Sequence, residues 1–128
     1  MFLLGVLVLA GCQQGNSTNF VSNVVTTPTK IQKIAFYYAL SADCNSLGKT
    51  EVRIITPPSN GQLKIEFTDD FPSYRSGDQR FHCNSRRVPG TKVIFIPNPN
   101  FAGQETIVTE GFYPNGRAAK LTSNITVR

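Results

Sequence analysis

The fold is decided by residues 91–112, TKVIFIPNPNFAGQETIVTEGF. The segment Thr91–Ile96 is apolar and β-branched, and Pro97–Asn100 cannot continue a strand. The residues of Glu105–Phe112 again favour an extended conformation. We therefore predict two strands joined by a turn, and these strands need a partner sheet to cover their apolar faces.

The composition of the whole chain also favours strands. The 128 residues include ten Gly and eight Pro, and 40% of them are hydrophobic, which suffices for one domain with a buried core. No long run of Ala, Leu, Glu and Lys follows the 3.6-residue period of a helix. The predicted class is all-β, with the single domain a small β-sandwich.

Further strands are predicted where apolar residues alternate with polar ones. These segments are Ile31–Leu40, Glu51–Thr56, Gln62–Phe67 and Ala119–Arg128.

Three turn or loop segments separate the predicted strands. Asn60-Gly61 predicts a tight hairpin after Pro57-Pro58, because both central positions of a type I′ turn need positive φ. Asn115-Gly116 predicts a second tight turn. Asp69–Pro89 has little periodicity, so we predict a long loop with one short strand near Arg80–Cys83.

The N-terminus carries an apolar run that stops at a cysteine. Phe2–Ala10, FLLGVLVLA, is too short to span a bilayer but has the length of a secretory h-region. Leu9-Ala10-Gly11-Cys12 resembles the lipobox of bacterial lipoproteins, in which the chain is cut before the cysteine and its thiol carries diacylglycerol. The resemblance implies removal of residues 1–11 and a lipid anchor on Cys12, which two or three acyl chains would make effectively permanent.

The same region predicts the cellular localisation and the domain boundaries. Met1 is followed by Phe2 without the usual Lys or Arg, so we expect either a true start upstream or a truncated sequence. The alternative to a signal peptide is a buried N-terminal strand with a core cysteine. Gln13, by similarity to enterobacterial sorting, favours the outer membrane over the inner one, with the protein facing the periplasm or the cell surface. Residues 12–30 are polar and predicted to be a flexible tether, with the start of an edge strand at Val24-Val25 as the alternative. Residues 31–128 are predicted to form the sandwich.

Two cysteines remain if Cys12 is acylated. In an exported protein the simplest interpretation of Cys44 and Cys83 is a disulfide. Closing a loop of about forty residues would stabilise the fold by roughly 4 kcal/mol. Two free buried thiols and a metal site are the alternatives, although zinc prefers four ligands and His82 is the only histidine.

The charge pattern favours anionic partners other than nucleic acid. Thirteen Lys and Arg against eight Asp and Glu give a net charge of +5, but the charges are scattered and form no basic helix. We therefore expect no nucleic-acid partner and favour acidic lipid or glycan surfaces. The most basic segment is the 69–89 loop, whose predicted ligand-contacting residues are Arg75, Arg80, Arg86 and Arg87.

No catalytic set is visible, so we expect a non-enzymatic protein without cofactor or metal. There is no relay of Ser, His and Asp and no Gly-rich phosphate loop. Asp69-Asp70 would suit glycoside hydrolysis only if both carboxylates faced one side, and a solvated turn is the favoured interpretation. His82 is expected to be a structural or exposed neighbour of the disulfide. Four tyrosines could form a ligand-contacting face, although packing is the simpler role: Tyr37, Tyr38, Tyr74 and Tyr113.

The turn residues of Glu51–Arg128 resemble those of bacterial immunoglobulin-like and cadherin-like domains. Thr56–Gly61, Val93–Pro97 and Pro99–Gly103 carry the resemblance. It implies an immunoglobulin-like antiparallel sandwich of about seven strands with a binding or structural role. Gln104 and Glu105 stand where the family has Asp, and no calcium site is carried over.

Three functions remain open at the level of sequence. The leading hypothesis is an envelope lipoprotein that binds an envelope protein or an anionic glycan or lipid through the arginine-rich loop. The alternatives are a structural accessory subunit that docks by a strand edge, and a small hydrolase or inhibitor.

Overall fold

The computed structural model describes residues 17–128. The predictions for the signal peptide, for the lipidated Cys12 and for Gln13 fall outside the described residues and stay predictions.

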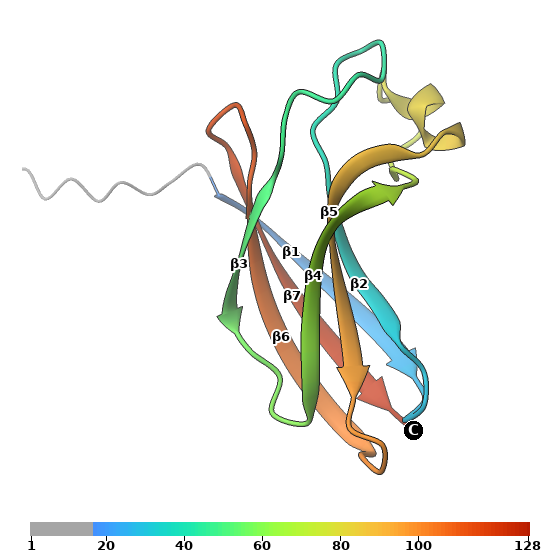
Figure 1. Ribbon diagram of the computed structural model, residues 1–128, viewed down its shortest axis with the longest axis vertical. Helices are drawn as coiled ribbons and strands as arrows, with labels where there is room; N and C mark the ends of the chain where they lie inside the picture. Colours follow the sequence, from blue (N-terminus) through green and yellow to red (C-terminus); the bar gives the residue numbers. More distant parts are fainter. Residues whose placement is uncertain (1–16) are drawn as a thin grey trace, which may run out of the picture.

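Seven strands and one short 3₁₀ helix make up the domain (Figure 1). Their bounds are β1 Ser17–Thr26, β2 Gln32–Tyr37, β3 Glu51–Thr56, β4 Gly61–Asp70, η1 Phe81–Ser85, β5 Val88–Pro97, β6 Gly103–Phe112 and β7 Ala118–Val127.

The strands form two sheets, as predicted for a β-sandwich. One sheet has the order β1-β7-β6-β3 and the other β2-β5-β4. This is the immunoglobulin arrangement of strands B, E and D on one sheet and C, F and G on the other, with the first strand placed beside the last. All pairs are antiparallel except β1 with β7, which is parallel and departs from the predicted all-antiparallel arrangement.

The core lies between the two sheets. Val93 and Phe95 of β5 are fully buried against Ile107 of β6 and Ile125 of β7. Burying each such side chain contributes about 1.5–3 kcal/mol. The two strands of the 91–112 stretch therefore belong to different sheets and hold the two layers together.

The predicted flexible tether is wrong for the residues that form β1. Ser17–Thr26 pairs with β7 over ten positions without a register shift. Only Thr26 of this strand is buried, so its sequence shows weak hydrophobic alternation. The backbone N–H and C=O groups of the strand are instead paired with β7. Pairing, which depends on the distant C-terminal strand, overrides the polar composition.

The first predicted core strand is present but shorter and irregular. β2 ends at Tyr37, and its register against β5 shifts between Lys33 and Ala35. A β-bulge reverses the alternation, so Ile34 and Tyr37 both face the core although their numbers differ in parity.

The predicted hairpin at Asn60-Gly61 is also wrong. β3 pairs with β6, whereas β4 pairs with β5, so the 57–60 segment crosses from one sheet to the other. The Asn60 N–H donates to Glu105 of β6. Gly61 does not have positive φ; a Cβ there would lie 2.5 Å from the Ile96 carbonyl oxygen, so glycine is needed for close packing.

The end of the chain agrees with prediction. The Tyr113–Arg117 turn joins β6 to β7, with Gly116 at φ 85°. Along β7, Ala119, Ser123 and Ile125 are buried as the alternation predicts. The β2–β3 and β4–β5 connections and this turn gather at one end of the sandwich, and the C-terminus lies at the other (Figure 1).

Candidate functional site

The predicted arginine loop connects β4 to β5. β4 extends to Asp70 and β5 starts at Val88, so the loop is shorter than predicted. The short strand predicted near Arg80–Cys83 is wrong, because Phe81–Ser85 forms the 3₁₀ helix η1.

A disulfide ties this loop to the β2–β3 connection, as predicted. Cys44 and Cys83 are bonded, with their Cα atoms 5.5 Å apart. Both are buried beside Leu40 and Val88 in a second, smaller core. Since η1 begins two residues before Cys83, the disulfide holds the loop against the end of the sandwich.

The four predicted arginines do not converge on one site. Arg75 and Arg86 are exposed, and Arg87 donates to the Asp69 carbonyl oxygen at 2.8 Å. Arg80 is half-buried, and its Nε donates to the Leu40 carbonyl oxygen at 2.9 Å. Of the four, Arg80 lines a cavity of about 330 Å³ that the other three do not line.

That cavity belongs to a groove along the side of the sandwich where β1 and β2 are the edge strands. Two adjoining hollows, of about 330 and 360 Å³, form it. Both are lined by Phe20 of β1, Tyr38 after β2, and Tyr113 and Ala119 around the β6–β7 turn. We call this surface the tyrosine groove.

The tyrosines of the groove are closely packed. The rings of Tyr38 and Tyr74 meet edge to face with centroids 5.3 Å apart. The Tyr38 hydroxyl accepts a hydrogen bond from the Ser73 N–H at 2.8 Å. Asn84 holds Tyr74 by two hydrogen bonds to its backbone, one accepted and one donated. These contacts hold the rings in a fixed orientation, which lowers the entropy lost when a ligand binds.

Burial raises the pKa of two phenol groups in the groove. It raises the pKa of Tyr113 to about 12, helped by the neighbouring Tyr37, Tyr38 and Tyr74. Burial also raises the pKa of Tyr74. Even the ordinary tyrosine pKa of about 10 leaves a phenol neutral at pH 7, so these two hydroxyls can donate hydrogen bonds as well as accept them.

Two guanidinium groups complete the groove at the loop end. Arg80 and Arg117 line the same hollow, together with Asn115 and Thr18. Within residues 17–128, the Arg117 guanidinium has no hydrogen bond or ion pair, whereas its backbone N–H is held by the Asn115 side chain at 3.0 Å. An arginine in this state can bind a carboxylate or phosphate with two parallel hydrogen bonds.

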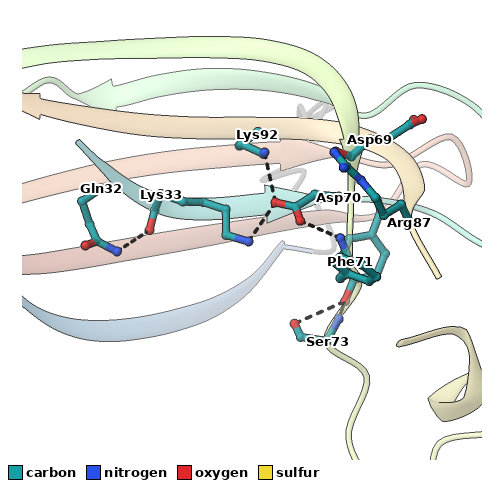
Figure 2. A network of polar contacts seen from close by, with 9 residues as sticks. Gln32, Lys33, Asp69, Asp70, Phe71, Ser73, Arg87 and Lys92 are labelled. Carbon is teal, nitrogen blue, oxygen red and sulfur yellow. Dashed lines mark hydrogen bonds and ion pairs between the residues drawn. The ribbon is translucent and has the colours of Figure 1, made fainter. Parts of the chain in front are cut away.

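The solvated turn predicted for Asp69-Asp70 is wrong, because both residues lie in β4. Asp69 and Asp70 are consecutive residues of β4, rather than a solvated turn, and their side chains point to opposite faces. Asp70 accepts from Lys33 Nζ at 2.9 Å and is 3.1 Å from Lys92 Nζ (Figure 2). The Lys33 bond chiefly, with the Phe71 N–H and Lys92, holds the pKa of Asp70 well below its usual range. Asp70 is thus ionised and bound within a structural network.

One group of possible metal ligands occurs in the described part of the chain. Cys44, His82 and Cys83 lie close together, and His82 Nε2 is 3.9 Å from Cys83 Sγ. The two sulfur atoms are bonded to each other, so neither is available as the thiolate that zinc requires. His82 is an exposed neighbour of the disulfide.

Several groove residues were not predicted from the sequence. Of the four tyrosines considered as a ligand face, Tyr38, Tyr74 and Tyr113 line one hollow, and Tyr37 lines the adjoining one. Arg117 and Phe20 were missed, and nothing in the local sequence marks Phe20. The closeness of Arg117 to the Asn115-Gly116 turn was the one available signal for an arginine at the loop end of the molecule.

Comparisons with protein-family models, with curated proteins and with solved structures found no match to this chain. Between Ser17 and Arg128, no helix has the length and apolar character needed to cross a membrane.

Proposed function

We propose that the protein is a non-enzymatic envelope lipoprotein whose β-sandwich binds an acidic glycan in the tyrosine groove. The observation that carries the proposal is the meeting of three tyrosines with Arg80 and Arg117 in one hollow. The groove replaces the arginine loop as the binding site, since Arg75, Arg86 and Arg87 lie outside it.

The chemistry of the lining suits a sugar that carries a carboxylate. A pyranose ring has apolar C–H faces that pack on aromatic rings, and hydroxyl groups that pair with phenols and amides. Tyr38, Tyr74 and Tyr113 supply the rings, and Asn115 supplies an amide. A planar guanidinium matches the geometry of a carboxylate, and Arg117 is free to make that contact.

The groove is well suited to binding rather than to catalysis. It contains two cations and four tyrosines but no carboxylate or histidine. General acid and base catalysis of glycoside hydrolysis needs two carboxylates flanking the bond. The arrangement therefore supports retention of an intact ligand.

The proposed lipid on Cys12 would place the groove near the membrane. Five positions separate Cys12 from Ser17, a span of at most about 18 Å when extended. Ser17 pairs with Ala118, and Thr18 lines the hollow that contains Arg117. A glycan displayed at the membrane surface would then be within reach.

The test is binding of oligosaccharides to the full chain, measured by calorimetry in a mild detergent. The panel contains uronic-acid and sialic-acid oligosaccharides, each beside its methyl ester, which keeps the sugar faces but removes the charge. Loss of charge-assisted hydrogen bonds in Arg117→Gln should weaken binding of the acidic sugar roughly tenfold or more. Arg75→Gln, an exposed arginine outside the groove, is the matched control and should have little effect.

Two results would contradict the proposal. If Arg117→Gln and Arg75→Gln weakened oligosaccharide binding equally, the groove would not be the binding site and the arginine-rich loop would again be the candidate. If no acidic sugar in the panel bound, the proposed glycan-binding function would be wrong. A stoichiometric protein captured by crosslinking in cells would then favour the accessory-subunit hypothesis.

A further inference from the structure

β4 is an open sheet edge that has neither a bulge nor a proline. It lies at the end of the order β2-β5-β4 and runs for ten residues, Gly61–Asp70, without a register shift. The edges β2 and β3 each carry an irregularity, and β3 is followed by Pro57-Pro58. Bulges and prolines prevent edge pairing, and β4 contains neither.

An apolar strip follows this edge. Leu63, Ile65 and Phe67 are on the core-facing side, opposite buried residues of β5. Ile65 is nevertheless 38% exposed and Phe67 50% exposed, because no strand lies beyond β4 within the described domain. Ile54 and Ile55 of β3 are exposed as well. Exposed apolar residues gathered along one edge are typical of an interaction surface.

The charges on the other side of β4 are self-complementary. Lys64 and Glu66 flank Ile65 symmetrically on the solvent face, and within one chain their side chains form an ion pair at 3.5 Å. In an antiparallel pair of two β4 strands with the two-fold axis at Ile65, Lys64 of each copy lies opposite Glu66 of the other. Leu63 of each copy likewise lies opposite Phe67 of the other. Opposite charges and apolar pairs directly across from each other stabilise antiparallel strands.

We propose that β4 pairs with β4 of a second copy of this chain in this register. The interface is isologous and joins the two β2-β5-β4 sheets into one of six strands, three from each copy. The strip formed by Leu63, Ile65 and Phe67 is then shared between the copies. This pairing is independent of the tyrosine groove, which lies along β1 and β2 at the opposite edges.

Neighbouring registers are less favourable. Moving the axis to Leu63 places Lys64 opposite Gln62, and moving it to Phe67 places Ile65 opposite Asp69. The other uninterrupted edge, β1, has the sequence STNFVSNVVT and contains no charge to select a register. The pattern around Ile65 therefore singles out β4.

The test uses charge exchange at positions 64 and 66 in the full chain. Molecular mass in a mild detergent is measured by sedimentation equilibrium across a concentration series. Lys64→Glu places Glu opposite Glu at two symmetric positions, and Glu66→Lys places Lys opposite Lys. Each single variant should weaken dimerisation roughly tenfold or more. The double variant K64E/E66K restores both opposite-charge pairs and should dimerise like the original chain.

Mixing the two single variants gives the sharpest result. A K64E chain beside an E66K chain has opposite charges at both positions, so the mixture should form heterodimers although each variant alone does not. A misfolded variant could not form the heterodimer. Circular dichroism of each variant alone therefore checks that it is folded. A chain that is monomeric at high micromolar concentration, or dimerisation that does not respond to the single changes, would overturn the proposal.

Discussion

Removing the disulfide should lower stability by an amount that the structure allows us to work out. Cys44 and Cys83 are separated by 39 positions, and the bond restricts the unfolded chain by closing that loop. The chain-entropy relation gives a loss of roughly 4 kcal/mol at 25 °C when the bond is removed. For a domain of this size, this corresponds to a fall in Tm of roughly 15 °C.

The perturbation is the double substitution Cys44→Ala and Cys83→Ala in the full chain. Urea unfolding is followed by circular dichroism, and the free energy of unfolding is obtained by linear extrapolation. Cys83 is fully buried, so the loss of its sulfur adds to the loss of the cross-link. The matched control is Cys12→Ser, which leaves the Cys44–Cys83 bond intact and should not change the unfolding curve.

A loss of less than about 1 kcal/mol in the double variant would refute this reasoning. It would mean that the unfolded chain is already restricted, or that the loop is held by its other contacts. Those contacts are the Arg80 bond to the Leu40 carbonyl and the paired bonds between Asn84 and Tyr74. Arg80→Met in the double variant would then cause the larger loss.

Two further predictions concern packing and pH. Gly111→Ala should lower the free energy of unfolding by about 1–3 kcal/mol, because the new Cβ would lie 2.4 Å from the Tyr37 ring. In urea unfolding, a smaller loss of stability in the Tyr37→Leu background would confirm the clash, and an equal loss would contradict it. Asp70 has a lowered pKa in the folded state, so its stabilising effect is present above the unfolded value of about 3.9 and is lost as the pH falls below it. Asp70→Asn should therefore cost about 1–2 kcal/mol at pH 7 and progressively less in acid, whereas a constant loss from neutral to acid pH would contradict the ionic role.

The candidate site could be predicted only in part. The sequence singled out the tyrosines as a group, but it placed the binding arginines in one loop because they are close along the chain. In the folded protein, Arg117 lines the same hollow as Arg80, whereas Arg75 is exposed and does not line it. The groove is built from β1, the end of β2, the disulfide-bound loop and the β6–β7 turn, which are distant in sequence. No local sequence pattern predicts that these distant segments come together.

By itself, the sequence determined the class of fold, most strands, the β6–β7 turn and the cysteine pair. Alternation of apolar and polar residues reports which face of a strand is buried, and Gly, Pro and Asn report where the chain must turn; both are local properties. The tertiary structure alone decided which strands pair. Asn60-Gly61 has residues typical of a hairpin turn. The chain nevertheless crosses between the sheets there, because β3 pairs with β6 and β4 pairs with β5. Polar β1 is ordered because β7 satisfies its backbone, a condition set by residues about a hundred positions away.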